Sequence, residues 1–255
     1  MKLSFFRSFS QFVNQGFKQN KTNPGTLTVS RLREMMPHLL EGYLSDDEMP
    51  DSLALLPPPP EHPSEAFLLD LEYARKAAEN TDKIRFMQAA ADADLSFPAA
   101  VKSFGSILNI EISGEKTPKL CMLLRRVMTD AGLSTYAAKN HYNRERPFVG
   151  NKIRTCTPEQ EEALRKVGSF PSGHAAVGWI WALILSEIFP EKKQALTNRG
   201  YEFGISRIVC HAHWHSDVEM GRAMAGATME KLCANPAFQK DLIAVKKEQI
   251  TISFK

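Results

Sequence analysis

The chain has 255 residues, of which 43% are hydrophobic and 24% are charged, and its formal net charge is +3. These values are typical of a globular protein with a sizeable core. The small net charge and the lack of a basic stripe in the sequence argue against nucleic-acid binding. The longest apolar run, residues 175–185, is shorter than the ~18 residues of a membrane-spanning helix, so we expect no membrane association.

The first 50 residues are expected to form an N-terminal extension that is partly flexible. Met1 to Phe6 begins like a secretory signal, but Arg7 interrupts the run before the ~7–15 apolar residues of a signal peptide are reached. Residues 51–250 are expected to form one domain, followed by a short tail at residues 251–255. Pro57–Pro60, near the start of the domain, predicts a stiff extended segment.

Helical signals recur from Ser64 onward. Ser64 and Thr117 mark two helix starts, and Gly132 ends the second helix. Another helix is predicted from Ser134 to Arg146, where Pro147 stops it. Further helices are predicted from Thr157 (a capping box) to about Gly168, from Ser172 to Phe189, from about Glu191 toward Ile208, and from about Ser216 to Leu232.

Strand-like alternation is confined to one weak candidate, residues 108–113. The predicted fold is therefore all-α, a single-domain helical bundle. The apolar helix after Ser172 is the element expected to be buried on most sides.

Lys139 and Arg146 lie seven residues apart, which is about two helical turns. If one helix carries both, they project from the same face, where two cations repel each other unless an anion lies between them. A solvent-facing pair is the plainer interpretation of this segment alone.

The segment Pro171–His174 leads into the apolar helix. The first turn of a helix leaves backbone N–H groups without partners, and the helix dipole is positive there, so anions bind. Ser172 adds a hydroxyl, Gly173 permits close approach of the backbone, and His174 stands beside the anion. The alternative is an ordinary helix cap with an incidental histidine.

The third segment ends with His213 and Asp217, four residues apart. A carboxylate bonded to one imidazole nitrogen fixes the tautomer and leaves the other nitrogen as a nucleophile. Arg207 offers a fork that matches phosphate oxygens. Arg207 and His213 are six residues apart, so a break in the helix around residues 210–212 is required to bring them together.

His211, His213 and His215 alternate, which is also a pattern of metal ligands in an extended chain. We favour a phosphoryl site, because no carboxylate or cysteine group completes a metal shell and a metal site leaves the arginines unexplained. Of the four cysteines, Cys156 and Cys210 lie near these segments and are the predicted disulfide pair.

Together the three segments read K-x6-R-P, P-S-G-H and S-R-x5-H-x3-D. On this motif, and on stretches such as residues 52–60 and 199–204, the chain resembles the bacterial class A non-specific acid phosphatases. That class belongs to the wider superfamily of type 2 phosphatidic acid phosphatases and vanadium haloperoxidases. The resemblance covers roughly residues 50–250 and implies that superfamily's helical fold.

The resemblance also implies a mechanism without metal or cofactor. His213 would attack phosphorus and form a phosphohistidine, Asp217 would orient His213, and His174 would protonate the leaving alcohol. Phosphate would be held by Lys139, Arg146, Ser172, Gly173 and Arg207. The expected substrates are small phosphomonoesters, cleaved best at acidic pH, and phosphotransfer is a further activity to expect. Family members are typically periplasmic, and dimers are common among them, so a periplasmic homodimer is expected.

Two positions depart from that family, which usually has glycine where His211 stands and glutamine where His215 stands. If position 211 needs a left-handed backbone, His211 is strained. Alternative functions are an apyrase-like nucleotide phosphohydrolase and a vanadate-dependent haloperoxidase. From a different class, a non-catalytic phosphate- or metal-binding protein is the alternative.

Overall fold

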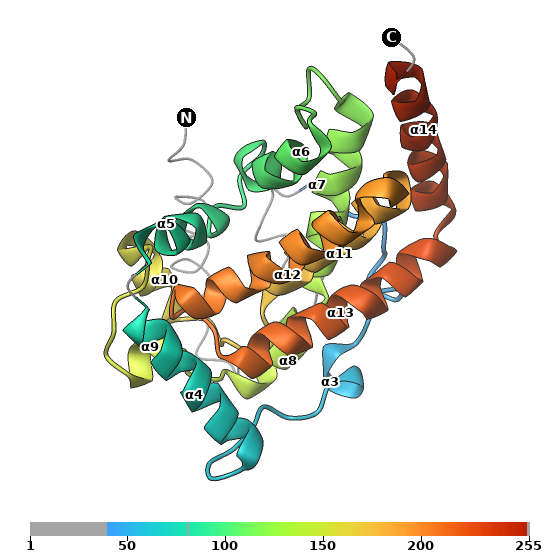
Figure 1. Ribbon diagram of the computed structural model, residues 1–255. Coiled ribbons are helices and arrows are strands. Elements are labelled where there is room, and N and C mark those ends of the chain that lie inside the picture. Colours follow the sequence, from blue (N-terminus) through green and yellow to red (C-terminus); the bar gives the residue numbers. More distant parts are fainter. Residues whose placement is uncertain (1–39, 81, 254–255) are drawn as a thin grey trace.

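The computed structural model describes residues 40–80 and 82–253, with side chains described as far as residue 248. Its regular elements are all helices within this part of the chain, which confirms the predicted all-α class, and residues 108–113 form a helix end and a turn rather than a strand (Figure 1). No described helix is long and apolar enough to cross a bilayer. The signal-like run at Met1 to Phe6 lies outside the described residues.

The helices are numbered as in Figure 1. In chain order they are α3 (Ser52–Leu55), α4 (Glu65–Glu79), α5 (Lys83–Asp92), η2 (Ala99–Val101), α6 (Lys102–Leu108), α7 (Pro118–Leu133), α8 (Tyr136–Tyr142), α9 (Pro147–Gly150), η3 (Pro158–Gln160), α10 (Glu161–Leu164), α11 (Gly173–Ile188), η4 (Pro190–Lys192), α12 (Lys193–Val209), α13 (His215–Ala234) and α14 (Pro236–Ser253). The η elements are short 3₁₀ turns.

The apolar helix α11 is the buried centre of the bundle, as predicted. It contacts α7, α12 and α13, and Figure 1 shows α11, α12 and α13 side by side. Trp181 is fully buried and meets the rings of Phe104 and Phe203 edge-on at 6.0 Å. Gly200 allows the close approach of α12, because a Cβ there would lie 2.4 Å from the Cβ of Ala182. This tight packing fixes the first turn of α11 relative to the end of α12.

The helix predicted to end near Leu232 is followed by another, α14, which the sequence analysis missed. Asn235 begins it, since its side-chain oxygen accepts hydrogen bonds from the backbone N–H groups of Ala237 (3.0 Å) and Phe238 (3.1 Å). Asn followed by Pro is a typical helix start. Residues 251–253, expected to be part of a tail, continue this helix.

The last part of the expected N-terminal extension is packed into the core. Tyr43, Leu44 and Met49 are buried in the main hydrophobic cluster. The backbone N–H of Tyr43 donates to the Asp130 carboxylate at 2.8 Å. The backbone carbonyl of Tyr43 accepts from the Asn235 side-chain amide at 3.0 Å. We therefore propose that Tyr43, Leu44 and Met49 belong to the folded domain rather than to a flexible extension.

Candidate active site

Lys139 and Arg146 do not share a helix, so the prediction of one continuous helix is wrong. Helix α8 ends at Tyr142, and the next residue, Asn143, has a left-handed φ of 39°. Arg146 then adopts an extended backbone, as expected for a residue before proline. Both cations are nevertheless buried, with 5% and 4% of their surfaces exposed.

Backbone carbonyls, rather than carboxylates, hold these two cations. The Nζ of Lys139 donates to the Pro171 carbonyl at 2.6 Å. Arg146 donates through Nε to the Leu164 carbonyl at 2.9 Å and through Nη1 to the Ala212 carbonyl at 2.8 Å. These neutral partners orient the side chains but do not balance their charge.

The predicted cap at the start of α11 is confirmed. The Oγ of Ser172 accepts a hydrogen bond from the N–H of Ala175 at 3.3 Å, and Gly173 is the first helical residue. The Ser172 N–H donates to the Asp217 carbonyl at 2.8 Å, which joins the second and third motif segments. By contrast, the predicted cap at Thr157 makes no side-chain bond, and the expected helix there is reduced to η3 and α10.

His174 follows this cap, and its Nε2 lies 3.1 Å from the Ala93 carbonyl. A carbonyl only accepts hydrogen bonds, so Nε2 carries a proton. In the neutral ring Nδ1 is therefore unprotonated, and in the charged ring Nδ1 carries the proton that can be transferred.

The helix break expected after Arg207 is confirmed. Helix α12 ends at Val209 and α13 begins at His215. The N–H groups of Ala212 (3.0 Å) and His213 (3.2 Å) both donate to the Arg207 carbonyl, which turns the chain back over Arg207. The Arg207 side chain is fully buried, and within the described part of the chain none of its three nitrogens has a hydrogen-bond acceptor. A buried guanidinium without acceptors is unfavourable, so an anion that supplies acceptors should bind it.

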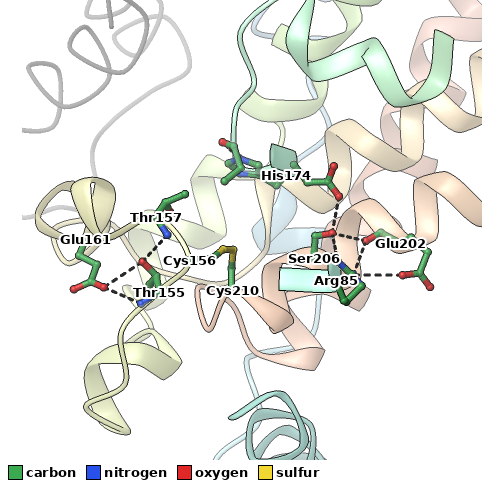
Figure 2. The surroundings of a disulfide bond; sticks show 11 residues. Arg85, Thr155, Cys156, Thr157, Glu161, His174, Glu202, Ser206 and Cys210 are labelled. Carbon is green, nitrogen blue, oxygen red and sulfur yellow. Dashed lines mark hydrogen bonds and ion pairs between the residues drawn. A yellow bond between two sulfur atoms is a disulfide. The ribbon is translucent and has the colours of Figure 1, made fainter. Parts of the chain in front are cut away.

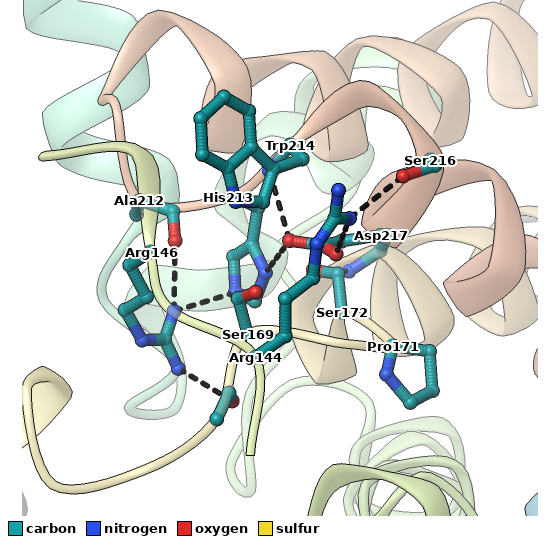
Figure 3. Close-up of polar contacts among 12 residues, drawn as sticks. Arg144, Arg146, Ser169, Pro171, Ser172, Ala212, His213, Trp214, Ser216 and Asp217 are labelled. Atoms are coloured by element: carbon teal, nitrogen blue, oxygen red, sulfur yellow. Dashed lines mark hydrogen bonds and ion pairs between the residues drawn. The ribbon is translucent and has the colours of Figure 1, made fainter. Parts of the chain in front are cut away.

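His213 lies between Arg146 and Asp217 (Figure 3). Arg146 Nη1 is 3.1 Å from Nε2 of His213, and Asp217 Oδ2 is 3.4 Å from Nδ1. Because a guanidinium only donates, Nε2 must be the acceptor, and the proton of the neutral ring sits on Nδ1 toward the carboxylate. The structure thus leaves Nε2 with a lone pair on the side of the cations.

Burial lowers the pKa of each cation of the site, and neighbouring positive charge lowers the pKa of Lys139 and Arg207 further. Burial, with the nearby Arg146, lowers the pKa of Lys139 to about 7 and that of Arg207 to about 9. Burial also lowers the pKa of His213 and of His174 well below 6.5, and neighbouring cations lower both further. The cation cluster, defined as Lys139, Arg146 and Arg207, therefore has an excess of positive charge that an anion would balance.

Two residues that contact this site were missed in the sequence. Arg144 Nη1 donates to Asp217 Oδ1 at 2.7 Å, and Arg144 Nη2 donates to Asp70 Oδ2 at 2.7 Å. Arg144 stands two residues before Arg146, so a second arginine in that segment was a visible signal. Asp70 is on α4, and no local pattern marks it.

The alternating histidines have separate surroundings. His215 stacks on Tyr73, with 4.0 Å between ring centroids, whereas His213 faces Arg146 and Asp217. No group of three or more His, Cys, Asp or Glu side chains in residues 40–80 and 82–253 is arranged to hold a metal ion.

The predicted disulfide between Cys156 and Cys210 is present, with 4.9 Å between Cα atoms. Figure 2 shows it joining the loop of Thr155 and Thr157 to the chain just after α12. Glu161 stabilises that loop, because its Oε1 accepts hydrogen bonds from the Thr155 N–H at 2.8 Å and from the Thr155 hydroxyl at 3.2 Å. The disulfide thus anchors the segment that leads to His213.

His211 has a left-handed backbone, with φ of 56°, where a side chain is unfavourable. His211→Ala and His211→Gly both remove the buried ring and differ only in the Cβ. We expect the glycine variant to be more stable than the alanine variant by about 1 kcal/mol. Urea unfolding of the two variants measures this difference, and equal stabilities would show that the backbone at position 211 is not strained.

Comparisons with known proteins identify relatives of this chain. Residues 120–235 match the model of the PAP2 superfamily. The chain is 42% identical to a non-specific acid phosphatase of Providencia stuartii, over 81% of this chain and 84% of the relative. It is 41% identical to a non-specific acid phosphatase of Salmonella typhimurium, over 82% and 84% of the two chains, and 35% identical to an acid phosphatase of Zymomonas mobilis, over 78% and 75%.

Proposed function

This chain belongs to the bacterial class A non-specific acid phosphatases of the PAP2 superfamily and is a phosphomonoester hydrolase, and we propose that it works through a phosphohistidine on His213. The observation that carries the proposal is the cation cluster beside an imidazole whose Nε2 lone pair points toward it and accepts from Arg146. Phosphoryl transfer depends chiefly on positioning and on stabilising negative charge. Three cations meet that need without a metal ion.

In the first step, Nε2 of His213 attacks phosphorus while the bond from phosphorus to the leaving oxygen breaks. His174 gives its Nδ1 proton to that oxygen. Arg207, whose nitrogens have no other acceptor among the described residues, takes up phosphoryl oxygens together with Lys139 and Arg146. The Ser172 hydroxyl and the Gly173 N–H, at the positive end of α11, are proposed to bind the same oxygens.

In the second step, water attacks the phosphohistidine and the bond from phosphorus to Nε2 breaks. The neutral His174 accepts the proton of the attacking water at Nδ1, and inorganic phosphate leaves. The Asp217 carboxylate faces Nδ1 of His213 and balances the positive charge that the ring carries while it is phosphorylated. An alcohol in place of water gives phosphotransfer.

The charges of this site predict an acidic pH optimum for kcat/KM. His213 must be neutral to attack, and its lowered pKa keeps it neutral in mildly acidic solution. Lys139 has a pKa of about 7, so it loses its charge as the pH rises through that value and the site holds a phosphate dianion less tightly. His174, whose pKa is also lowered, is charged less often as the pH rises. We therefore expect kcat/KM to fall as the pH rises, first as His174 loses its proton below pH 6.5 and again near pH 7, where Lys139 loses its charge.

A pH profile of phosphomonoester hydrolysis measures this fall, and Lys139→Arg identifies its source. Arginine is a stronger base than lysine, so the basic limb should move to higher pH in the variant if Lys139 sets it. A wild-type profile that is flat from pH 5 to 9 would contradict the assigned roles of Lys139 and of both histidines.

A substrate panel and an alkaline quench test the function itself. Phosphohistidine survives alkali, so rapid mixing with a labelled phosphomonoester should trap label on the protein. Nucleoside triphosphates and pyrophosphate in the same panel would reveal an apyrase-like preference. Halide oxidation with added vanadate would reveal a haloperoxidase.

We also propose that the protein works in the periplasm. Disulfides persist in oxidising compartments and are rare in a reducing cytosol, and Cys156 is bonded to Cys210 beside the site. Cell fractionation tests this proposal, which fails if the active protein is recovered with reduced thiols from the cytosol.

A further inference from the structure

A buried arginine, Arg144, contacts the Asp217 oxygen that does not face His213 (Figure 3). The Arg144 side chain is 9% exposed, and the two carboxylates that it joins, Asp70 and Asp217, have side chains that are 0% exposed. Its guanidinium also lies over the ring of Trp214, 5.4 Å from the centroid. None of these contacts involves the face of His213 on which the phosphoryl group would bind, so the proposed chemistry leaves them unexplained.

The two oxygens of Asp217 have separate partners. Oδ1 accepts from Arg144 at 2.7 Å, whereas Oδ2 accepts from the Trp214 N–H at 2.9 Å and faces Nδ1 of His213. A carboxylate held at both oxygens cannot rotate about its last bond. Arg144 therefore fixes the direction in which Oδ2 points toward the imidazole.

Asp70 completes the network from α4, 146 positions before Ser216 in the chain. Its Oδ1 accepts from the Ser216 N–H at 2.7 Å, and its Oδ2 accepts from the Ser216 hydroxyl at 2.6 Å and from Arg144. Asp70 thus binds both Arg144 and the first turn of α13, the helix that carries Asp217.

The charges of this network explain why a second carboxylate is needed. Arg144 and Asp217 alone would sum to zero, and a neutral pair stabilises a positive imidazole poorly. With Asp70 the sum is −1, the same as that of an isolated Asp217. The group is buried, so these charges act on His213 with little screening by solvent.

We propose that Arg144 and Asp70 are positioning residues for the phosphohistidine step: Arg144 orients the Asp217 carboxylate, and Asp70 restores the negative charge that Arg144 would cancel. This inference rests on the function proposed above. Neither residue contacts the reacting phosphoryl group, so both act through Asp217 and His213.

The first test is Asp70→Asn, which keeps the size of the side chain and removes its charge. We expect kcat to fall about 10–100-fold, the range seen for residues that orient metal-binding histidines, with KM little changed because the cation cluster is intact. The pKa of His213 should fall further, because the variant has one negative charge fewer nearby, so the acidic limb of kcat/KM should move to lower pH. The other charged or titratable groups that face His213 stay the same: Lys139, Arg146, His174, Arg207 and Asp217.

Arg144→Lys is the second test, and it also serves if Asp70→Asn does not fold. Lysine keeps the buried charge, but one ammonium cannot replace a fork that reaches two carboxylates. We expect kcat to fall while the acidic limb stays in place. The two variants therefore separate the orienting role from the charge-balancing role.

Asp241→Asn is the matched control. Asp241, on α14, accepts from the Tyr43 hydroxyl at 2.8 Å and pairs with Arg126 at 3.4 Å. Figure 1 shows α14 and α4 at opposite ends of the molecule. This variant should keep the wild-type kcat and pH profile even if it unfolds more easily.

Alkaline quench of a single turnover gives the deciding readout. Slower formation of phosphoenzyme in Asp70→Asn than in wild type supports the proposal. Equal rates and equal pH profiles, with only a lower melting temperature, would show that the network is merely structural and overturn it. If wild type itself forms no phosphoenzyme, the proposed function falls and this inference falls with it.

Discussion

Replacing His213 with alanine is expected to lower kcat for phosphomonoester hydrolysis by about 10⁴-fold or more, because the attacking nitrogen is lost. The cation cluster is untouched, so inorganic phosphate should still bind. Steady-state kinetics measures the loss, and the rise in melting temperature on adding phosphate measures the retained binding. Alkaline quench should find no label on the variant.

His141→Ala is the matched control, because it removes an exposed imidazole of α8, close in sequence to Lys139. Its kcat should equal that of wild type. A His213→Ala variant that keeps a tenth of the wild-type kcat would rule out His213 as the nucleophile. Loss of phosphate binding together with activity would instead show that the ring is needed to hold the site together.

Much of the site could be predicted because each motif segment encodes its own local structure. Ser172 caps α11 through its own hydroxyl, and the apolar residues that follow require a buried helix. The spacing between Arg207 and His213 required a break in the helix, and the structure has one. In these places short-range physics decides the conformation, so the sequence was sufficient.

The failures came where distant parts of the chain decide the result. The spacing of Lys139 and Arg146 suggested one helix, but Asn143 takes a left-handed conformation and the chain turns. Both cations reach the site because carbonyls from distant segments hold them. Asp70 was missed since its partners, Arg144 and Ser216, are more than seventy positions away in the chain.

Replacing Arg207 with methionine is expected to raise the stability of the protein while it lowers activity. Its charged group is buried without an acceptor among the described residues, which is costly when no anion is bound. The lowering of its pKa to about 9 reflects how strongly burial and Arg146 disfavour the charged form. Methionine is flexible and apolar, so it can fill the same space. We expect a gain of about 1–4 kcal/mol in the free energy of unfolding, the range seen when buried charges are replaced by apolar residues.

The same substitution should lower kcat by about 10²–10³-fold, the usual effect of removing one donor to a developing oxyanion. Urea unfolding and steady-state kinetics measure the two effects. Arg126→Met is the control, and we expect it to lower the free energy of unfolding rather than raise it. Arg126 is paired with Asp241 and lies over the Tyr43 ring at 3.7 Å. Losing these contacts should destabilise the protein and leave kcat unchanged.

Phosphate connects the two effects of Arg207→Met. An anion that binds the folded wild type supplies the missing acceptors, so it should stabilise wild type by about 2.7 kcal/mol at 100 times its Kd. The variant should gain much less, and the stability difference between the two proteins should shrink as phosphate is added. A variant that is less stable than wild type in the absence of phosphate would show that Arg207 has favourable partners already. In that case the cation cluster would not be poised for an anion, and the proposed phosphoryl site would lose its main support.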